Sequence, residues 1–375
     1  MARDIRAHPL RIRANRFLLI DGNAIVHRAY HAYPQTLRTS KGELINAVYG
    51  FTSILLSVLK DLRPKYVAVA FDLKGPTFRH KKFKGYKASR PEMDEELVDQ
   101  LDRVKQVVST LNIPIFEKKG FEADDVIGTL ALQAKVPNLK SQISNLKSAT
   151  QKTELENSKT LKLPDSKNLG IIIATGDRDA LQLIDNHVKV YLPARGKKPA
   201  ELVGRKEFIK KYRFEPERLV DLKALAGDAS DEIPGVKGVG PKTATDLIVR
   251  FGDLKSIYKS LDEIKESVRL KLVKDKKKAF LSYELAEIET AVPIKLKLKK
   301  CKLADYDRDK VLELFEELEF RTLISRLPDD GWQEMVKKEM GIDSDRKGAT
   351  LKNRTSTSVG DTENTEKKDR QMKLF

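Results

Sequence analysis

Residues 120–125 read GFEADD, so three carboxylates, Glu122, Asp124 and Asp125, fall within four positions. Apolar residues then recur at helical spacing over 126–134, which predicts that the acids lie at the start of a helix. The partial positive charge of a helix N-terminus tolerates acids, so an acidic first turn is common without further function. Similar acids recur along the chain where buried strands are expected to end, and this recurrence favours a shared metal site.

Other acids follow apolar runs that are expected to form buried strands. Asp21 and Asp72 come directly after the first two runs, and Asp177 and Asp179 follow the clearest expected buried strand, residues 170–174. In open parallel sheets, functional sites form beyond the carboxyl ends of the strands. The pattern therefore predicts an α/β fold in which one edge of the sheet gathers these carboxylates.

Asp228 and Asp231 add two more carboxylates in the segment GDASDE, residues 227–232. So many acids cannot all ionise side by side without compensating cations, and hard oxygen ligands suit Mg²⁺ or Mn²⁺. Two such ions can activate a water and stabilise the attacking and leaving oxygens of a phosphodiester. His27 and His31 have the i, i+4 spacing of some metal ligands, but no glutamate follows His27 directly, and we interpret them as packing or hydrogen-bonding residues.

The composition is that of a basic protein. The 375 residues include 72 lysines and arginines against 55 acids, a formal net charge of +17, and such a surface attracts polyanions. No apolar run is long enough to span a membrane, and residues 1–16 form a basic extension without the apolar core of a secretory signal. A single cysteine, Cys301, excludes an internal disulfide and a cysteine-rich zinc site, so we expect a reducing cytoplasm.

Residues 78–90 read FRHKKFKGYKASR, a run in which basic and aromatic residues interleave. Aromatic rings can stack on unpaired bases while lysine and arginine neutralise phosphates, which predicts a contact with single-stranded nucleic acid. The alternative is a solvated basic loop.

Residues 233–244 read IPGVKGVGPKTA, a Gly-apolar-Gly hairpin followed by a helix with Pro241 near its first turn. Glycines let the backbone approach a phosphate closely, and free amides at the helix start then bind it. We interpret the segment as a helix-hairpin-helix element that grips a DNA backbone without regard to base sequence. An ordinary glycine-rich turn is the alternative.

In this order, the motifs resemble the 5′-nuclease domain of bacterial DNA polymerase I, within the wider flap-endonuclease family. The resemblance covers residues 17–327, apart from an insertion at 136–168. It implies a PIN-like α/β core with a mainly parallel central sheet, a helical arch and a C-terminal helix-hairpin-helix subdomain. It also implies a 5′-3′ exonuclease and 5′-flap endonuclease that uses two metal ions on DNA or RNA-primed DNA, in primer removal and repair.

The resemblance also assigns roles to single residues. The ligands of a first metal would be Asp21, Asp72, Glu122 and Asp124, and those of a second Asp177, Asp179 and Asp231, with Asp125 and Asp228 in support. The basic segment would contact DNA through Arg79, Lys84, Tyr86, Lys87 and Arg90, and Lys87 and Arg90 would neutralise charge on the scissile phosphate. The hairpin contacts, which in relatives also hold K⁺, would be Gly235, Lys237, Gly238, Gly240, Lys242 and Thr243.

Four regions are expected along the chain. They are a basic extension (1–16), a catalytic core (17–205) with a flexible inserted loop (136–168), a helical hairpin subdomain (206–327) and a mostly disordered tail (328–375). Glu232 stands where the family usually has asparagine, which could alter metal affinity. The sequence ends at residue 375, before any proofreading or polymerase domain, so we expect a stand-alone, monomeric nuclease.

The last five residues, QMKLF, resemble the Gln-x-x-Leu-Phe motif that binds bacterial sliding clamps. Gln371, Leu374 and Phe375 would then dock on the clamp, with a chance match as the alternative. Two other functions stay open. A non-catalytic DNA-binding protein of the same fold would gain nothing from acids that face phosphate, and a PIN-type RNase would not need the hairpin and the basic segment. The expected location is the cytoplasm, at the bacterial nucleoid.

Overall fold

The computed structural model describes residues 15–135, 169–194, 196, 198–303 and 306–328. Six strands form one sheet in the order β3-β2-β1-β4-β5-β6. All neighbouring strands are parallel except β5 and β6, which confirms the predicted α/β fold with a mainly parallel sheet. The strands are β1 Arg16–Asp21, β2 Tyr66–Ala70, β3 Ile115–Phe116, β4 Gly170–Ala174, β5 Val188–Leu192 and β6 Glu201–Val203.

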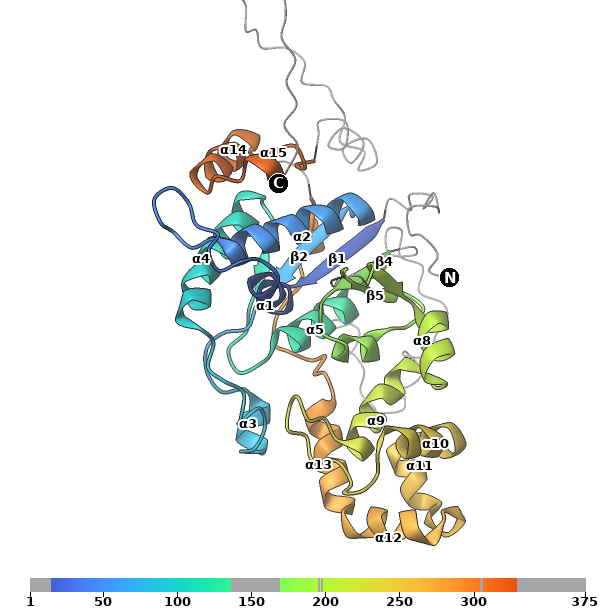
Figure 1. Cartoon of the computed structure of the whole chain (residues 1–375). Helices are drawn as coiled ribbons and strands as arrows, with labels where there is room; N and C mark the ends of the chain where they lie inside the picture. Colours follow the sequence, from blue (N-terminus) through green and yellow to red (C-terminus); the bar gives the residue numbers. More distant parts are fainter. Residues whose placement is uncertain (1–14, 136–168, 195, 197, 304–305, 329–375) are drawn as a thin grey trace, which may run out of the picture.

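Helices cover both faces of the sheet and form a second lobe below it (Figure 1). The helices of the core are α1 Gly22–Ala32, α2 Asn46–Leu62, α4 Glu95–Thr110, α5 Ala123–Lys135 and α8 Arg205–Tyr212, and the short α3 Phe78–Lys82 lies below the sheet beside the lower lobe. The lower lobe holds α9 Leu219–Ala226, α10 Pro241–Phe251, α11 Leu254–Lys259, α12 Glu266–Lys274 and α13 Lys276–Ala286. The last helices are α14 Arg308–Glu317 and α15 Arg321–Ile324.

Side chains of β1 alternate between two hydrophobic clusters, as expected for a strand buried on both faces. Phe17 and Leu19 belong to the cluster that contains the apolar face of α5. Leu18 and Ile20 belong to the other cluster, with the apolar faces of α1, α2 and α4. The sheet is therefore covered on both sides, and its carboxyl edge is left as the place where polar side chains can gather.

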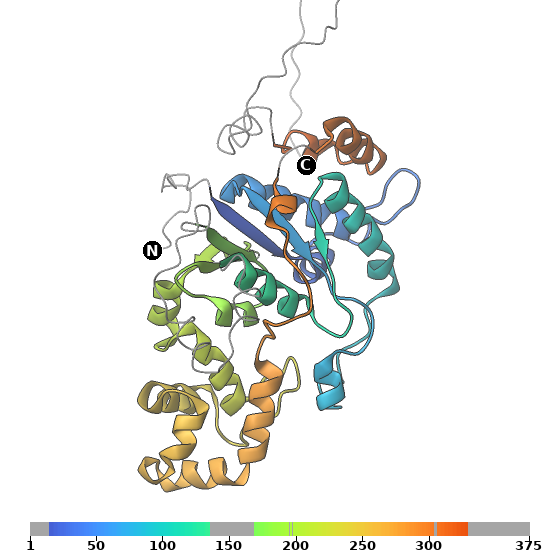
Figure 2. The same cartoon turned by 180° about the vertical axis from the view of Figure 1, so that it is seen from behind.

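The chain returns to the core after the lower lobe. Lys302 forms an antiparallel bridge with Tyr66, and α14 and α15 then lie beside α2 and α4, far from the other late helices (Figure 2). Phe315 and Phe320 are fully buried in the same cluster as α2. The last two helices, which the predicted helical subdomain (206–327) includes, thus bury their apolar faces against the core.

No helix among the described residues is long and apolar enough to cross a membrane.

Candidate metal centre and nucleic-acid interface

The strand-end acids meet at the carboxyl edge of the sheet. β2, β1 and β4 are adjacent and parallel, so their carboxyl ends lie level. Asp21 ends β1, Asp72 follows β2 and Asp177 follows β4. Glu122 and Asp124 lie at the start of α5, whose first amide donates to Asp72. The structure thus brings together acids from separate parts of the sequence.

Asp21 is held by two donors. Its carboxylate accepts from the backbone N–H of Ala24 at 3.0 Å and from the hydroxyl of Thr175 at 2.8 Å. The Thr175 oxygen accepts in turn from the backbone N–H of Asp177 at 2.9 Å, so Thr175 links two acidic motifs. Burial raises the pKa of Asp21 to about 7, and the nearby carboxylates of Asp72 and Asp177 add to the rise.

Asp72 connects α1 to α5 through hydrogen bonds. Its backbone N–H donates to Oδ1 of Asn23 at 2.9 Å, and its own Oδ1 accepts from the backbone N–H of Ala123 at 2.6 Å. Burial raises the pKa of Asp72. Asn23 and Thr175 were not among the predicted site residues, although each lies two positions from a predicted acid.

Glu122 is surrounded by cationic and hydroxyl donors. Lys87 donates to its Oε2 at 2.9 Å, Tyr86 donates to the same oxygen at 3.1 Å, and the guanidinium of Arg79 lies 3.5 Å away. Burial alone would raise the pKa of Glu122, but Lys87 and Arg79 outweigh it and lower the pKa. Asp124 has no such excess of cations, and burial beside the Asp125 carboxylate raises its pKa.

A second group of acids comes from three segments. Single carboxylate oxygens of Asp179, Asp228 and Asp231 all lie within 4.8 Å of one another. The ammonium of Lys223, on α9, donates to both Asp179 and Asp228. Burial raises the pKa of Asp179 to about 6. Asp177 lies beside this group rather than within it, and its Oδ1 accepts from the backbone N–H of Asp179 at 2.9 Å.

The donor set fits divalent metal ions. Both groups offer hard carboxylate oxygens, which Mg²⁺ and Mn²⁺ prefer. Burial raises the pKa of Asp21, Asp124 and Asp179, and neighbouring carboxylates add to the rise. A divalent cation would supply compensating positive charge, and Asp179, Asp228 and Asp231 are close enough to share one.

The turn at residues 87–90 is docked against this second group. The backbone N–H of Lys87 donates to the carbonyl of Asp231 at 3.2 Å, and the side chain of Arg90 lies 3.3 Å from the Asp231 carboxylate. Glu232 accepts from the backbone N–H of Ser89 at 2.7 Å, so its carboxylate supports the turn. Lys87 and Glu232 both have positive φ, 52° and 57°, a strained conformation that often occurs at functional sites.

Three predicted site residues have other roles in the structure. Arg79 is buried and forms a bidentate ion pair with Asp125 at 2.7 and 2.8 Å, so neither side chain is free for DNA or metal. Tyr86 is also buried, and its ring cannot stack on a base without a rearrangement. The predictions of a DNA contact for Arg79 and Tyr86 and of a metal contact for Asp125 are therefore not supported.

The hairpin between α9 and α10 is held in place by hydrogen bonds to residues of α12, α13 and the position between them. Gly235 is buried with φ of +60°, and its amide donates to the hydroxyl of Ser282 at 3.0 Å. The amide of Lys237 donates to Asp275 at 3.0 Å, and Lys271 donates to the carbonyl of Gly238 at 3.0 Å.

Helix α10 then begins at Pro241, after the N-cap Gly240. Gly238, Gly240 and Lys242 are exposed, with Thr243 partly exposed in the first turn. The first amides of a helix have no partner within it. These exposed residues of the hairpin can therefore contact phosphates. Gly235 and the amide of Lys237 instead hold the shape of the hairpin through internal hydrogen bonds.

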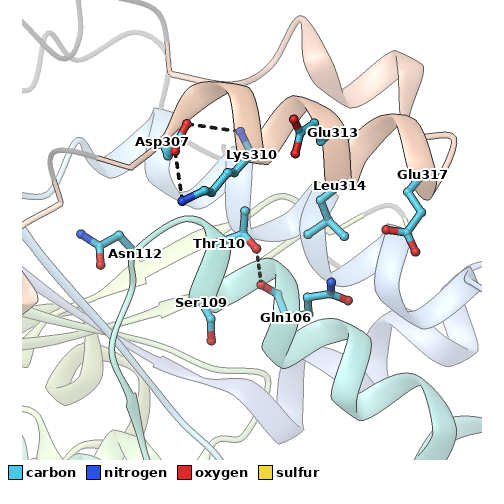
Figure 3. A pocket seen from close by; sticks show the side chains of 9 residues that line it. All are labelled: Gln106, Ser109, Thr110, Asn112, Asp307, Lys310, Glu313, Leu314 and Glu317. Atoms are coloured by element: carbon cyan, nitrogen blue, oxygen red, sulfur yellow. Dashed lines mark hydrogen bonds and ion pairs between the residues drawn. The ribbon is translucent and has the colours of Figure 1, made fainter.

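A groove of about 600 Å³ lies elsewhere, between α4 and α14 (Figure 3). Its lining mixes polar and apolar surface, with Thr110 and Gln106 from α4 and Lys310, Glu313 and Leu314 from α14. None of the predicted site residues lines it. The predicted clamp motif (Gln371, Leu374 and Phe375), the insertion and residues 1–14 of the basic extension lie outside the described residues, whereas Arg16, the last residue assigned to the extension, begins β1.

Two family models match the chain. The model of the 5′-3′ exonuclease N-terminal resolvase-like domain matches residues 16–151, and that of the 5′-3′ exonuclease C-terminal SAM fold matches residues 214–309.

The curated relatives include DNA polymerase I of Chloroflexus aurantiacus, 41% identical over 318 residues, and that of Caldicellulosiruptor bescii, 38% identical over 326 residues. These matches cover 83% and 86% of this chain but 30% and 34% of the relatives. The chain therefore spans about a third of the length of the curated relatives it matches.

Solved structures share the fold at low sequence identity. A T5 5′-exonuclease with bound zinc ions is 18% identical, with a TM-score of 0.54 over 81% of this chain and 98% of that one. A bacteriophage T5 flap endonuclease in complex with DNA and metal ions is 16% identical, with a TM-score of 0.54 over 87% and 99%. At these identities the likeness establishes the fold alone.

Proposed function

The chain belongs to the 5′-3′ exonuclease family, and from this membership we propose that it is a metal-dependent nuclease that cuts DNA at a 5′ end or a 5′ flap. One observation carries the proposal. Two groups of acids, from motifs spread over residues 21–231, meet at the carboxyl edge of the sheet, and Lys87 contacts Glu122 of one group and Asp231 of the other. A protein that only binds DNA would gain nothing from this concentration of negative charge next to phosphate.

The proposed metal ligands are the acids of these two groups. Asp21, Asp72, Glu122 and Asp124 would hold one ion, and Asp179, Asp228 and Asp231 would hold a second with Asp177 beside them. When bound, two divalent ions activate a water and stabilise the attacking and leaving oxygens of the phosphodiester. Mg²⁺ or Mn²⁺ suits the all-oxygen ligand set.

The cationic residues of the 87–90 turn have a separate task. Lys87 and Arg90 lie against the acids at 2.9 and 3.3 Å, so their charges are already directed to the place where a scissile phosphate would approach. Fixed positive charge at that place stabilises negative charge that develops during cleavage. Lys84, exposed on the same segment, would contact the phosphates of the 5′ strand.

The hairpin would hold the duplex behind the cut. The exposed backbone of Gly238 and Gly240 and the first turn of α10, with Lys242 and Thr243, offer donors to consecutive phosphates. The family resemblance adds K⁺ at this hairpin, and a comparison of duplex affinity in potassium and sodium buffers tests it. Such contacts ignore base identity, so the substrate would be chosen by its shape, with RNA-primed DNA included.

The test is cleavage of a 5′-labelled flap substrate in Mg²⁺, with an EDTA control. Asp124→Ala should abolish cutting near the junction. Asp99→Ala, which removes an exposed acid on α4, should leave it unchanged. Absence of cutting by the wild-type protein, with structure-dependent DNA binding intact, would instead favour a non-catalytic DNA-binding protein.

A partner and a location complete the proposal. The C-terminal QMKLF would dock on a bacterial sliding clamp, which would place the nuclease at replicating DNA in the cytoplasm. Deletion of Gln371–Phe375 should weaken clamp binding without a change in flap cleavage by the free enzyme. Equal clamp binding by the deletion variant would remove this part of the proposal.

A further inference from the structure

Among the described cationic side chains near the acids, Arg79 makes the most hydrogen bonds. Its side chain is 1% exposed, and its guanidinium makes the bidentate pair with Asp125 described above. Its Nε donates to the carbonyl of Leu285 at 2.9 Å, and Nη2 donates to the carbonyl of Glu287 at 2.7 Å. These carbonyls lie at the C-terminal end of α13, where the helix dipole favours a cation.

Asp125 transmits this arrangement to the metal site. Its Oδ2 accepts from the backbone N–H of Glu122 at 3.0 Å, and its Oδ1 accepts from the backbone N–H of Glu289 at 2.9 Å. Each oxygen thus accepts from Arg79 and from one amide. The ion pair fixes the backbone of Glu122 at the start of α5, and the guanidinium also lies 3.5 Å from the Glu122 carboxylate.

Stability alone is a poor explanation for such a pair. Removing two charges from water costs several kcal/mol per ion, and apolar pairs of similar volume are often at least as stabilising. What an apolar pair cannot provide is an acceptor for the Glu122 amide and a cation beside its carboxylate. What the Arg79–Asp125 pair specifically provides is therefore the position of Glu122.

We propose that Arg79 is a positioning residue that orients Glu122 for metal binding through Asp125, and that it ties this orientation to the docked end of α13. The inference rests on the proposed metal-dependent function. Residues that orient metal ligands typically change metal affinity 10- to 100-fold when they are lost. A shift of that size in metal binding is the expected effect.

The chain supplies a matched control for the link between α3 and α13. Lys82 and Glu284 join the same two helices by an ion pair, but both side chains are about half exposed and neither contacts Glu122. Glu284→Gln breaks this exposed link. If the connection between the helices were all that mattered, Glu284→Gln and Arg79→Lys would act alike, whereas the proposal expects an effect from Arg79→Lys only.

The experiment measures Mn²⁺ binding by electron paramagnetic resonance on the full chain, without DNA, together with thermal unfolding. Arg79→Lys keeps the charge but loses the bidentate geometry, and it should weaken Mn²⁺ binding about 10-fold or more. The double variant Arg79→Met/Asp125→Leu keeps the core filled without charge. It leaves the amides of Glu122 and Glu289 and two backbone carbonyls without these partners, so it should unfold at a lower temperature, and it should bind Mn²⁺ at least about 10-fold more weakly.

The outcomes separate this inference from the proposed function. Wild-type Mn²⁺ affinity in both folded Arg79 variants would overturn the inference and leave the proposed function intact. Absence of Mn²⁺ binding by the wild-type protein would overturn both. If the double variant does not fold, the affinity of Arg79→Lys relative to Glu284→Gln decides.

Discussion

Lys87 donates to Glu122 across 2.9 Å, from a turn in which Lys87 itself has positive φ. The ammonium also lies 3.8 Å from Asp231, so one lysine connects the two groups of acids. Its pKa is raised because the charges of Glu122 and Asp231 outweigh the effect of burial. Lys87 therefore stays protonated at neutral pH and can stabilise charge on a bound phosphate.

Loss of this ammonium should slow cleavage more than it weakens substrate binding. We expect Lys87→Ala to lower kcat about 100-fold or more with a much smaller change in KM, as for other residues that stabilise transition-state charge. Lys84→Ala is the comparison, since Lys84 is exposed on the same segment and should change mainly KM. Steady-state cleavage of a flap substrate measures both, and an equal change in KM for the two variants would contradict the assignment.

Lys223→Met should make the fold depend on divalent metal. Its ammonium neutralises Asp179 and Asp228, and without it their carboxylates repel each other across the second group of acids. We expect the unfolding temperature of the variant to fall by several degrees in EDTA and to recover with Mn²⁺. Calorimetry in the two buffers checks this, and an equal loss with and without metal would show that Lys223 acts only through packing.

Asp221 should make stability decrease as pH rises. It is buried, and burial raises its folded pKa to about 6 from an ordinary value of 3.8. Between these values the folded protein holds a proton that the unfolded chain has released, so the free energy of unfolding falls by up to about 3 kcal/mol. Urea unfolding of wild type and Asp221→Asn at pH values below 4 and above 7 isolates this effect, because the variant should lack it. Parallel pH profiles would contradict the prediction.

Two glycines of the hairpin should respond differently to alanine. A Cβ at Gly235 would meet the backbone nitrogen of Gly227 at 2.3 Å, and φ is +60° there, so Gly235→Ala should cost about 2 kcal/mol or more. Gly240 has nothing within 4 Å of such a Cβ, and Gly240→Ala should leave the unfolding temperature nearly unchanged. Thermal unfolding and duplex affinity should be measured for both variants. Equal unfolding temperatures of the two variants would contradict the prediction.

Cys301 should be unreactive in the folded protein. It is 1% exposed, and burial raises the pKa of its thiol to about 12, so almost no thiolate exists at neutral pH. A thiol reagent should label it only in denaturant, at a rate that reports unfolding. Rapid labelling under native conditions would indicate local opening near residue 301.

The strands and the gathering of the acids could be predicted because both depend on local patterns. An apolar run followed by an acid identifies Asp21 and Asp72 without knowledge of any distant residue. The burial of Arg79 could not be predicted, because its Nε donates to the carbonyl of Leu285, which is 206 positions away. Lys223 was not predicted for a similar reason, since it lies on α9 of the lower lobe and its partner Asp179 belongs to the core.

The return of the chain from the lower lobe has a consequence for biosynthesis. Leu303 donates its backbone N–H to Lys65, and the aromatic side chains of Phe315 and Phe320 complete the cluster around α2. These residues leave the ribosome only after the whole lower lobe has been made. The first strands must therefore wait with one hydrophobic face incompletely covered while more than 200 further residues are translated, which at about 5–20 residues per second lasts from roughly ten to forty seconds. During that interval the nascent chain would be a substrate for chaperones that shield apolar surface.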